Sequence, residues 1–178
     1  MKIRSNKGFT LIELLIVVAI IGIIAAIAVP GLLRARMSGN EASAIGSLRA
    51  INSGQAAYSS SCASGAYAIT LEDLVLAPSG STQGFISPDL NVTGVVKSGY
   101  TITLEQDATA GTTAMSGVTT CNAATSVPAS SYYASAVPVT VGGTGTRAFA
   151  TDTRGTIFFD ATGVAPINPI PSAATVVQ

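Results

Sequence analysis

The sequence predicts an α+β protein in which one long N-terminal helix packs on a small antiparallel β-meander. Two observations predict this fold class. Residues 9–30 are almost wholly apolar, and apolar residues then recur at helical spacing to about residue 60. Beyond residue 61, short runs that alternate apolar and polar residues are separated by glycine and proline, which is typical of antiparallel strands joined by turns.

The first element is a helix that begins at Phe9. In the 21 residues from Phe9 to Val29, only Thr10, Glu13 and Gly22 are not strongly apolar. As a helix this stretch spans about 31 Å, which is close to the thickness of a bilayer core. Three basic residues come before it, and the positive-inside tendency would keep that end of the chain in the cytoplasm. These residues are Lys2, Arg4 and Lys7.

Three interpretations of this segment remain open from the residues alone. It could be a secretory signal cleaved after Ala26-Ile27-Ala28, a permanent single-span anchor, or a working helix that is freed by a cut between Gly8 and Phe9. Glu13 favours the third, because a carboxylate near the bilayer centre costs about 2.5–3.5 kcal/mol and a signal or anchor gains nothing from it. After such a cut, the free amine of Phe9 could pair with Glu13 of the same or a neighbouring chain.

The stretch Lys7-Gly8-Phe9-Thr10-Leu11-Ile12-Glu13, followed by the apolar run, closely resembles the N-terminal signature of type IV pilins and type II secretion pseudopilins. In that family a prepilin peptidase cuts after the glycine and N-methylates the new first residue. The resemblance implies that residues 1–8 are a leader, that cleavage lies between Gly8 and Phe9, that Phe9 is methylated and that Glu13 directs assembly. It also implies the pilin fold.

The same resemblance implies the partners of the chain. These are further copies of itself in a filament, the prepilin peptidase, the inner-membrane assembly platform with its ATPase, and the membrane before extraction. The expected location is the bacterial inner membrane as a single-pass precursor, then a surface pilus or a periplasmic pseudopilus.

Gly22 and Pro30 are predicted to weaken the helix. Inside a helix, glycine costs about 1 kcal/mol relative to alanine and proline about 3 kcal/mol. Proline also removes a backbone hydrogen bond and bends the axis. Residues 22–30 are therefore the part most ready to bend or unwind, and the resemblance implies that they melt in a filament. A kinked membrane helix would have the same sequence.

Residues 31–60 are predicted to continue the helix in amphipathic form. An apolar stripe at a spacing of three to four residues should pack on the sheet. It consists of Ala44, Leu48, Ile51, Gln55 and Tyr58. Four charged residues are expected to provide the polar faces. They are Arg34, Arg36, Glu41 and Arg49.

Residues 61–178 are predicted to form the globular β head. Thr70 is expected to cap a short helix that ends near Leu76. The strand candidates give a meander of three or four strands, with a further short strand possible near Cys121 and an extended proline-rich tail. These candidates are Val92–Val96, Tyr100–Glu105, Tyr132–Val139, Arg147–Asp152 and Thr156–Asp160.

The chain has two cysteines, Cys62 and Cys121, and the apparent export signal favours one disulfide between them over two buried thiols. The loop that the bond closes is long, so the chain-entropy estimate of its stabilisation is about 4 kcal/mol.

Composition argues against enzymes and nucleic-acid binders. Histidine is absent, and nine basic residues balance nine acidic ones. No catalytic, cofactor-binding or metal-binding set is predicted. Four acidic residues could supply calcium oxygens, but their spacing is not that of an EF-hand and favours turn caps. They are Glu105, Asp107, Asp152 and Asp160.

The sequence therefore predicts a structural subunit of a type IV pilus. The alternative from the same family is a type II secretion pseudopilin, and the alternative from another class is an anchored domain that never polymerises. Nine basic side chains less the three of the leader leave six against nine acidic ones, a formal net charge of −3 for the trimmed chain.

Overall fold

The structure is a computed structural model that describes residues 8–177, so Lys2, Arg4 and Lys7 of the expected leader lie outside the described residues. The chain divides into two compact units, Met1–Arg36 and Met37–Gln178, and the second is called the head below.

Helix α1 runs from Leu11 to Ser61 and crosses both predicted weak points. Gly22 and Pro30 lie inside it and the helix is unbroken at either residue. The expected start at Phe9 is two residues early, because Thr10 caps the helix and Leu11 is its first residue. Unwinding of residues 22–30 in an assembly stays a prediction.

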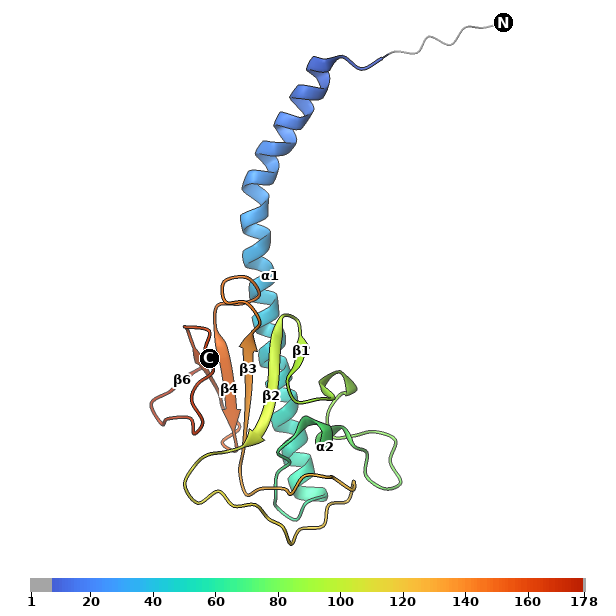
Figure 1. Ribbon diagram of the computed structural model, residues 1–178, viewed down its shortest axis with the longest axis vertical. Helices are drawn as coiled ribbons and strands as arrows, with labels where there is room; N and C mark the ends of the chain where they lie inside the picture. The colour runs from blue at the N-terminus through green and yellow to red at the C-terminus, as the bar shows by residue number, and fades with distance from the viewer. Residues whose placement is uncertain (1–7, 178) are drawn as a thin grey trace, which may run out of the picture. The chain divides into compact units, whose positions relative to one another are not determined.

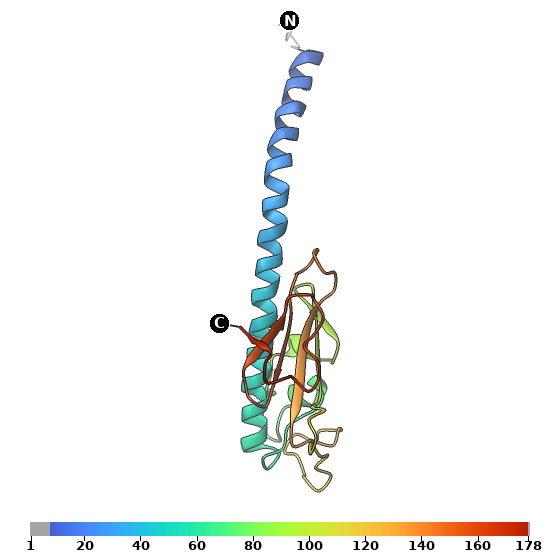
Figure 2. The same cartoon turned by 90° about the vertical axis from the view of Figure 1, so that its left-hand side faces the viewer.

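The head is built on one antiparallel sheet of six strands in the order β1-β2-β3-β4-β5-β6. Figures 1 and 2 show this sheet lying along the part of α1 that belongs to the head. The strands are β1 (Val95–Lys97), β2 (Tyr100–Gln106), β3 (Tyr132–Pro138), β4 (Ala148–Asp152), β5 (Ile157–Asp160) and β6 (Thr175–Val176). The meander is confirmed, but the expected number of three or four strands is wrong.

Local chemistry explains why β1 starts later than expected and why β6 was not predicted. The first strand starts at Val95 and not at Val92, because the Val95 N–H donates to the Val92 carbonyl at 3.0 Å in a turn that contains Gly94 at φ +89°. β6 was missed because the tail is rich in proline. The residues after Pro171 keep their N–H groups, and two of them pair with β5 through Phe158↔Val176 and Phe159↔Thr175.

The predicted stripe of α1 forms one wall of the core. All of its members are buried, and the four apolar ones share a core cluster with alternate residues of β2 and with Phe149 of β4, while the Gln55 amide bonds to the Ala68 backbone. The members are Ala44, Leu48, Ile51, Gln55 and Tyr58, and the β2 residues are Tyr100, Ile102 and Leu104.

The opposite face of the sheet is covered over β3 to β5 by the C-terminal loop. Tyr133, Ala150, Phe158 and Ile170 form a second small cluster there. The Tyr133 hydroxyl donates to the carbonyl of Pro166. Over β2 this face is more open to solvent, and Thr101 and Thr103 there are half-buried.

A short helix, α2 (Leu71–Val75), is capped by Thr70 as predicted. Its buried Asp73 accepts hydrogen bonds from the backbone N–H groups of Thr125 at 2.9 Å and Ser126 at 3.3 Å. Because that carboxylate takes these N–H groups, residues 116–128 form a loop, and the expected strand near Cys121 is absent there. A 3₁₀ helix, η1 (Pro88–Leu90), follows in the connection to β1.

The structure pairs Cys62 with Cys121 in a disulfide, with 4.8 Å between the Cα atoms. Cys62 is the residue after the last of α1. The Cys121 N–H also donates to the Cys62 carbonyl at 3.2 Å. The bond therefore ties residues 116–128 to the end of the long helix.

Candidate functional site

Residues 9–33 expose every large apolar side chain that they carry. Phe9 is 87% exposed, and the least exposed of these side chains, Val17, is still 48% exposed. Fully burying one such side chain stabilises a protein by about 1.5–3 kcal/mol, so leaving all of them in water is very unfavourable. By length and composition α1 could cross a membrane. This segment requires an apolar environment that the described residues 8–177 do not provide.

The first turn of α1 is a capping box made by Thr10 and Glu13. The Glu13 N–H donates to the Thr10 hydroxyl at 3.3 Å. The Thr10 N–H and hydroxyl donate in return to Oε2 of Glu13, at 2.9 and 2.6 Å. Such reciprocal bonds satisfy two backbone donors that a helix start otherwise leaves without partners.

This geometry leaves half of the Glu13 carboxylate free. Oε2 accepts both bonds from Thr10, whereas Oε1 makes no hydrogen bond with any residue between 8 and 177. The carboxylate is folded back toward the helix start, beside the residues that precede it. Sequence reasoning singled out Glu13 but missed Thr10, although a threonine three residues before a glutamate at the start of an apolar run is the signature of a capping box.

Gly8 and Phe9 precede the helix and are exposed. The bond between them therefore lies in exposed chain outside regular secondary structure. The structure thus brings Gly8, Phe9 and Glu13 together at the start of α1. Gly22 and Pro30 lie farther along the helix, and the Cys62–Cys121 pair lies in the head.

The predicted position of Glu41 on a polar face of the helix is wrong. The residue was expected there, but it is only 7% exposed. Its Oε2 accepts from Nε and Nη2 of Arg147, at 2.9 and 2.7 Å. Its Oε1 accepts from the N–H and hydroxyl of Thr146, both at 3.0 Å. In this ion pair two guanidinium N–H groups share one carboxylate oxygen, and it joins α1 to the residue just before β4 within the head.

The surroundings of Glu41 favour its ionised form. Burial raises the pKa of the Glu41 carboxyl, but the bonds from Thr146 and Arg147 and the charge of Arg147 outweigh burial and hold the pKa below its usual value. The Arg147 guanidinium also lies over the rings of Phe149 and Phe159, at 5.4 and 5.3 Å from their centres. This clamp is structural and is separate from the exposed segment.

The four acidic residues considered for calcium all have partners in the head. Asp152 pairs with Arg154 at 2.6 Å. The other three accept hydrogen bonds from Ser131, Thr162 and Asn168, at 2.8, 2.7 and 3.0 Å. Those three are Asp107, Asp160 and Glu105. Among residues 8–177, no three His, Cys, Asp or Glu side chains are grouped as metal ligands.

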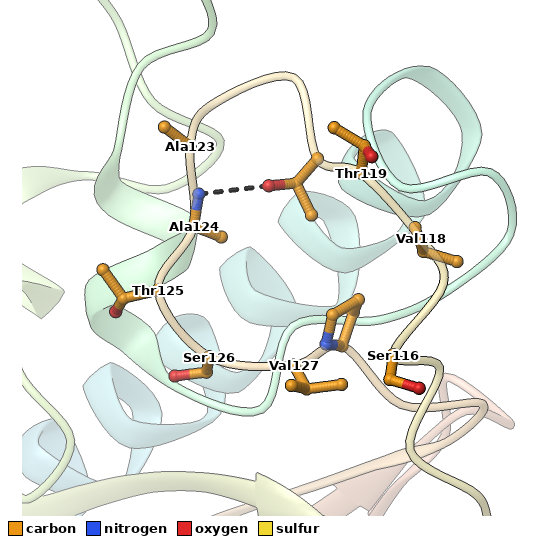
Figure 3. Close-up of a pocket in the computed structure, with 10 residues that line it drawn as sticks. Ser116, Val118, Thr119, Ala123, Ala124, Thr125, Ser126 and Val127 are labelled. Atoms are coloured by element: carbon orange, nitrogen blue, oxygen red, sulfur yellow. Dashed lines mark hydrogen bonds between the residues drawn. The ribbon is translucent and has the colours of Figure 1, made fainter.

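The head has several open pockets, and one of them is lined by loop residues alone. Residues 116–128 curl around a space of about 330 Å³, where the Ala124 N–H donates to the Thr120 hydroxyl at 3.1 Å (Figure 3). Its ten lining residues include no charged side chain, so this cavity brings no acid, base or nucleophile pair together. The charged residues that line the other pockets are all held by partners within the head; they are Asp107, Arg147, Asp152, Arg154 and Asp160. The exposed helical segment is therefore the leading functional candidate.

Comparison with known proteins matches this segment. Residues 3–29 match the prokaryotic N-terminal methylation motif. The chain is 63% identical over 38 residues to the type IV wide pilus major component PilA4 of Thermus thermophilus, and 47% identical over 53 residues to the type IV major pilin protein PilA of Myxococcus xanthus. A fimbrial protein of Pseudomonas aeruginosa is 78% identical over 27 residues.

These matches cover a minor part of each protein. They span 21%, 30% and 15% of this chain, and 29%, 24% and 18% of the Thermus, Myxococcus and Pseudomonas proteins. No solved structure shows a significant match to the chain.

Proposed function

Because the chain carries the prokaryotic N-terminal methylation motif and is similar to type IV pilins over that region, we propose that it is a structural subunit of a type IV pilus. The observation that carries the proposal is the single Glu13 carboxylate, with one oxygen bonded by Thr10, in an apolar helical segment that none of residues 8–177 covers. Copies of the same helix, packed side by side, would supply the missing apolar environment.

Processing would complete the site. A prepilin peptidase would cut between Gly8 and Phe9, and the new amine of Phe9, which is methylated in this mechanism, would lie one residue before Thr10. The free Oε1 of Glu13 could then accept from the Phe9 amine of its own or a neighbouring chain. A carboxylate and an amine that are paired cost far less to bury than either one alone. Subunits would pack until each Glu13 had found such a partner.

The same chemistry supports the proposed route of assembly. Before assembly, the apolar segment would span the inner membrane, with the basic leader in the cytoplasm. The inner-membrane assembly platform and its ATPase would then extract the subunit into the filament. Residues 22–30 would be the part that unwinds as the helix leaves the bilayer, because Gly22 and Pro30 lower its stability.

The relatives named as pilus components, the disulfide and the serine- and threonine-rich head favour a surface pilus. A type II secretion pseudopilus would use the same N-terminal segment in a short periplasmic filament. Electron microscopy of sheared surface material separates the two, because only the pilus gives long fibres that contain this chain.

The test compares two carboxylate deletions in cells that express the chain. Glu13→Ala should abolish fibres and leave the trimmed protein in the membrane. Glu105→Ala removes an exposed carboxylate of the head and should leave fibre yield unchanged. The mass of the mature chain should show loss of residues 1–8 and gain of one methyl group on Phe9. Normal fibres from Glu13→Ala, or a mature chain that still begins at Met1, would contradict the proposal.

A further inference from the structure

The end of the head at which α1 enters carries three loops, which are together called the entry face below. Residues 98–99 join β1 to β2, residues 139–146 lie between β3 and β4, and residues 161–164 follow β5. The Asn40 amide of α1 donates to the Thr144 carbonyl at 2.8 Å, which fixes the second loop to the helix where it enters the head (Figure 1).

The three loops of the entry face pack on one another. The Val139 N–H donates to the Gly99 carbonyl at 3.0 Å. A Cβ atom added to Gly99 would lie 2.8 Å from the Thr144 Cβ. One added to Gly163 would lie 2.6 Å from a methyl group of Val141. Because the two glycines allow this close approach, the three loops form one continuous surface.

The entry face exposes valine and lacks charge. Val139, Val141 and Val164 are 54%, 56% and 66% exposed. None of the residues in the three loops is charged. Single exposed apolar residues are ordinary on a protein surface, but three of them on one uncharged surface are typical of a contact site. Residues 8–177 leave this surface uncovered.

The charged residues that border the entry face have partners within the head. Lys97, directly before the first loop, pairs with Asp89 at 2.6 Å. Arg147, directly after the second loop, pairs with Glu41 at 2.7 Å. Asp160, directly before the third loop, accepts the N–H of the second residue after it at 2.7 Å. Apolar contact is therefore the main interaction that the entry face offers.

The connection to the apolar segment identifies the lipid bilayer as the partner. The segment ends at Leu33, and Asn40, which binds the entry face, is seven residues farther along α1. Seven residues of helix span about 10 Å, so the entry face stays within reach of the bilayer surface while the segment spans the membrane. Arg34 and Arg36 lie between these two points, are exposed and form no ion pair among residues 8–177. Cations at that place attract anionic lipid headgroups.

We propose that the entry face contacts the headgroup region of the bilayer while the subunit is still in the membrane. Its three valines lie at the boundary of the acyl chains, and Arg34 and Arg36 lie among anionic headgroups. This proposal rests on the membrane stage of the proposed function. Apolar burial and attraction to anionic lipid both strengthen interfacial binding. The contact holds the head at the bilayer surface until the subunit is extracted.

Nuclear magnetic resonance tests the contact with the full chain in nanodiscs of mixed neutral and anionic lipid, one chain in each disc. Overhauser cross-peaks arise only between protons in near contact. The methyl groups of Val139, Val141 and Val164 should give cross-peaks to the headgroup and glycerol protons of the lipid. Val127 is 45% exposed in the loop that the disulfide ties to the far end of α1, and it should give cross-peaks to water only.

The methyl groups of Ile20, in the middle of the apolar segment, separate failure of the inference from failure of the proposed function. They should give cross-peaks to the acyl chains, and their absence would overturn the membrane stage itself. Acyl cross-peaks from Ile20 without lipid cross-peaks from the three valines would overturn the inference alone. Valine cross-peaks that appear only in discs with several chains would also overturn it, because the partner would then be another copy.

Two sets of variants test the forces that hold the contact. Val141→Thr with Val164→Thr keeps the size of two exposed side chains and should weaken the lipid cross-peaks of Val139 roughly twofold or more, because it removes apolar area. Val127→Thr is the matched control and should leave these cross-peaks unchanged. Equal cross-peaks in the double variant and the unchanged chain would contradict the inference.

The second set removes the two cations. Arg34→Gln with Arg36→Gln should weaken the lipid cross-peaks of Val139 in discs that contain anionic lipid and leave them unchanged in discs of neutral lipid alone. Arg49→Gln removes a cation farther along the same helix and should change neither. Unchanged cross-peaks in the anionic discs would contradict the inference.

Discussion

The exposed segment of residues 9–33 and the head differ in how completely each satisfies its own chemistry. In the head, large apolar side chains gather in two clusters, and Glu41, Asp73, Asp107 and Asp152 are each buried with hydrogen-bond donors. In the exposed segment, every large apolar side chain remains outside and Glu13 keeps one free oxygen.

This difference assigns folding stability to the head and the proposed assembly function to the exposed segment. The head can reach its folded state without another chain, because its contacts are internal. Apart from the capping box of Thr10 and Glu13, the large side chains of the segment stay exposed, so they matter only when a membrane or another copy covers them. Substitutions in the two regions should therefore appear in different measurements.

The largest effect on folding is expected at Phe149, which is fully buried between α1 and the sheet. Phe149→Ala should reduce the free energy of unfolding of the head by about 3–5 kcal/mol, because it removes apolar contacts and leaves a cavity. The measurement is urea unfolding of the full chain in detergent, followed by near-ultraviolet circular dichroism of the tyrosines.

Leu15→Ala is the matched change in the exposed segment. It removes a large apolar side chain, but it should alter head unfolding by less than about 0.5 kcal/mol, because Leu15 is 59% exposed and lies outside the head. If the two substitutions destabilise the head equally, the separation of the two regions is wrong.

The next largest effect is expected from the disulfide. Its loop spans 59 residues, and the chain-entropy estimate for a loop of that length is about 4 kcal/mol. Replacing Cys62 and Cys121 together by serine should lower the unfolding free energy of the head by about 2–4 kcal/mol. In this variant, fibre yield should fall only as far as the loss of head stability requires. Glu13→Ala, in contrast, should lose fibres while the unfolding free energy of the head stays unchanged. Loss of fibres with an intact head in the serine variant would place the disulfide in the assembly contact.

A smaller effect is expected from the clamp between Glu41 and Arg147. Glu41→Gln keeps the shape of the side chain but removes its charge, which should cost the head about 2 kcal/mol. The loss stays moderate because the Arg147 side chain is 39% exposed and can turn to water. Glu105→Gln, at an exposed carboxylate, is the control and should cost less than about 0.5 kcal/mol.

The clamp also predicts how head stability depends on pH. The folded state holds the pKa of Glu41 below its usual value, so its contribution is fully present above the unfolded pKa of about 4.5. As the pH falls through the lowered folded pKa, Glu41 binds a proton and the contribution is lost. Unfolding of the unchanged chain between pH 7 and pH 3 should therefore show a steeper decline than Glu41→Gln. Parallel curves would mean that Glu41 does not couple proton binding to folding.

The sequence predicted those elements whose buried residues recur at regular spacing along the chain. The buried stripe from Ala44 to Tyr58 could be predicted because core positions in a helix recur every three to four residues. The buried residues from Tyr100 to Leu104 could be predicted because core positions in a strand alternate with exposed ones. Glu13 stood out because a charge is costly in an apolar run.

Features that depend on contacts between residues far apart in the sequence could not be predicted from local pattern. Glu41 resembles any surface glutamate until β4 brings Arg147 within 2.7 Å, across 106 positions of sequence. The loop near Cys121 forms because Asp73, 52 positions from Thr125, takes its N–H. β6 is two residues long, and no pattern can mark so short a strand. Such elements are decided by tertiary contacts, which local pattern does not contain.

The smallest expected effect lies at the start of the exposed segment, where the Thr10 hydroxyl donates a hydrogen bond to the Glu13 carboxylate. Thr10→Val keeps the size of the side chain but removes the hydroxyl from the capping box, so it should destabilise the first turn of α1 by about 1 kcal/mol. Amide hydrogen exchange of that turn, measured in detergent, should become about five times faster, since about 1 kcal/mol corresponds to that factor. Thr10→Ser keeps the hydroxyl and should exchange like the unchanged chain, and head unfolding should be the same in all three. Unchanged exchange in Thr10→Val would show that the hydroxyl does not hold Glu13, and that the backbone bond from Thr10 alone sets the position of the carboxylate.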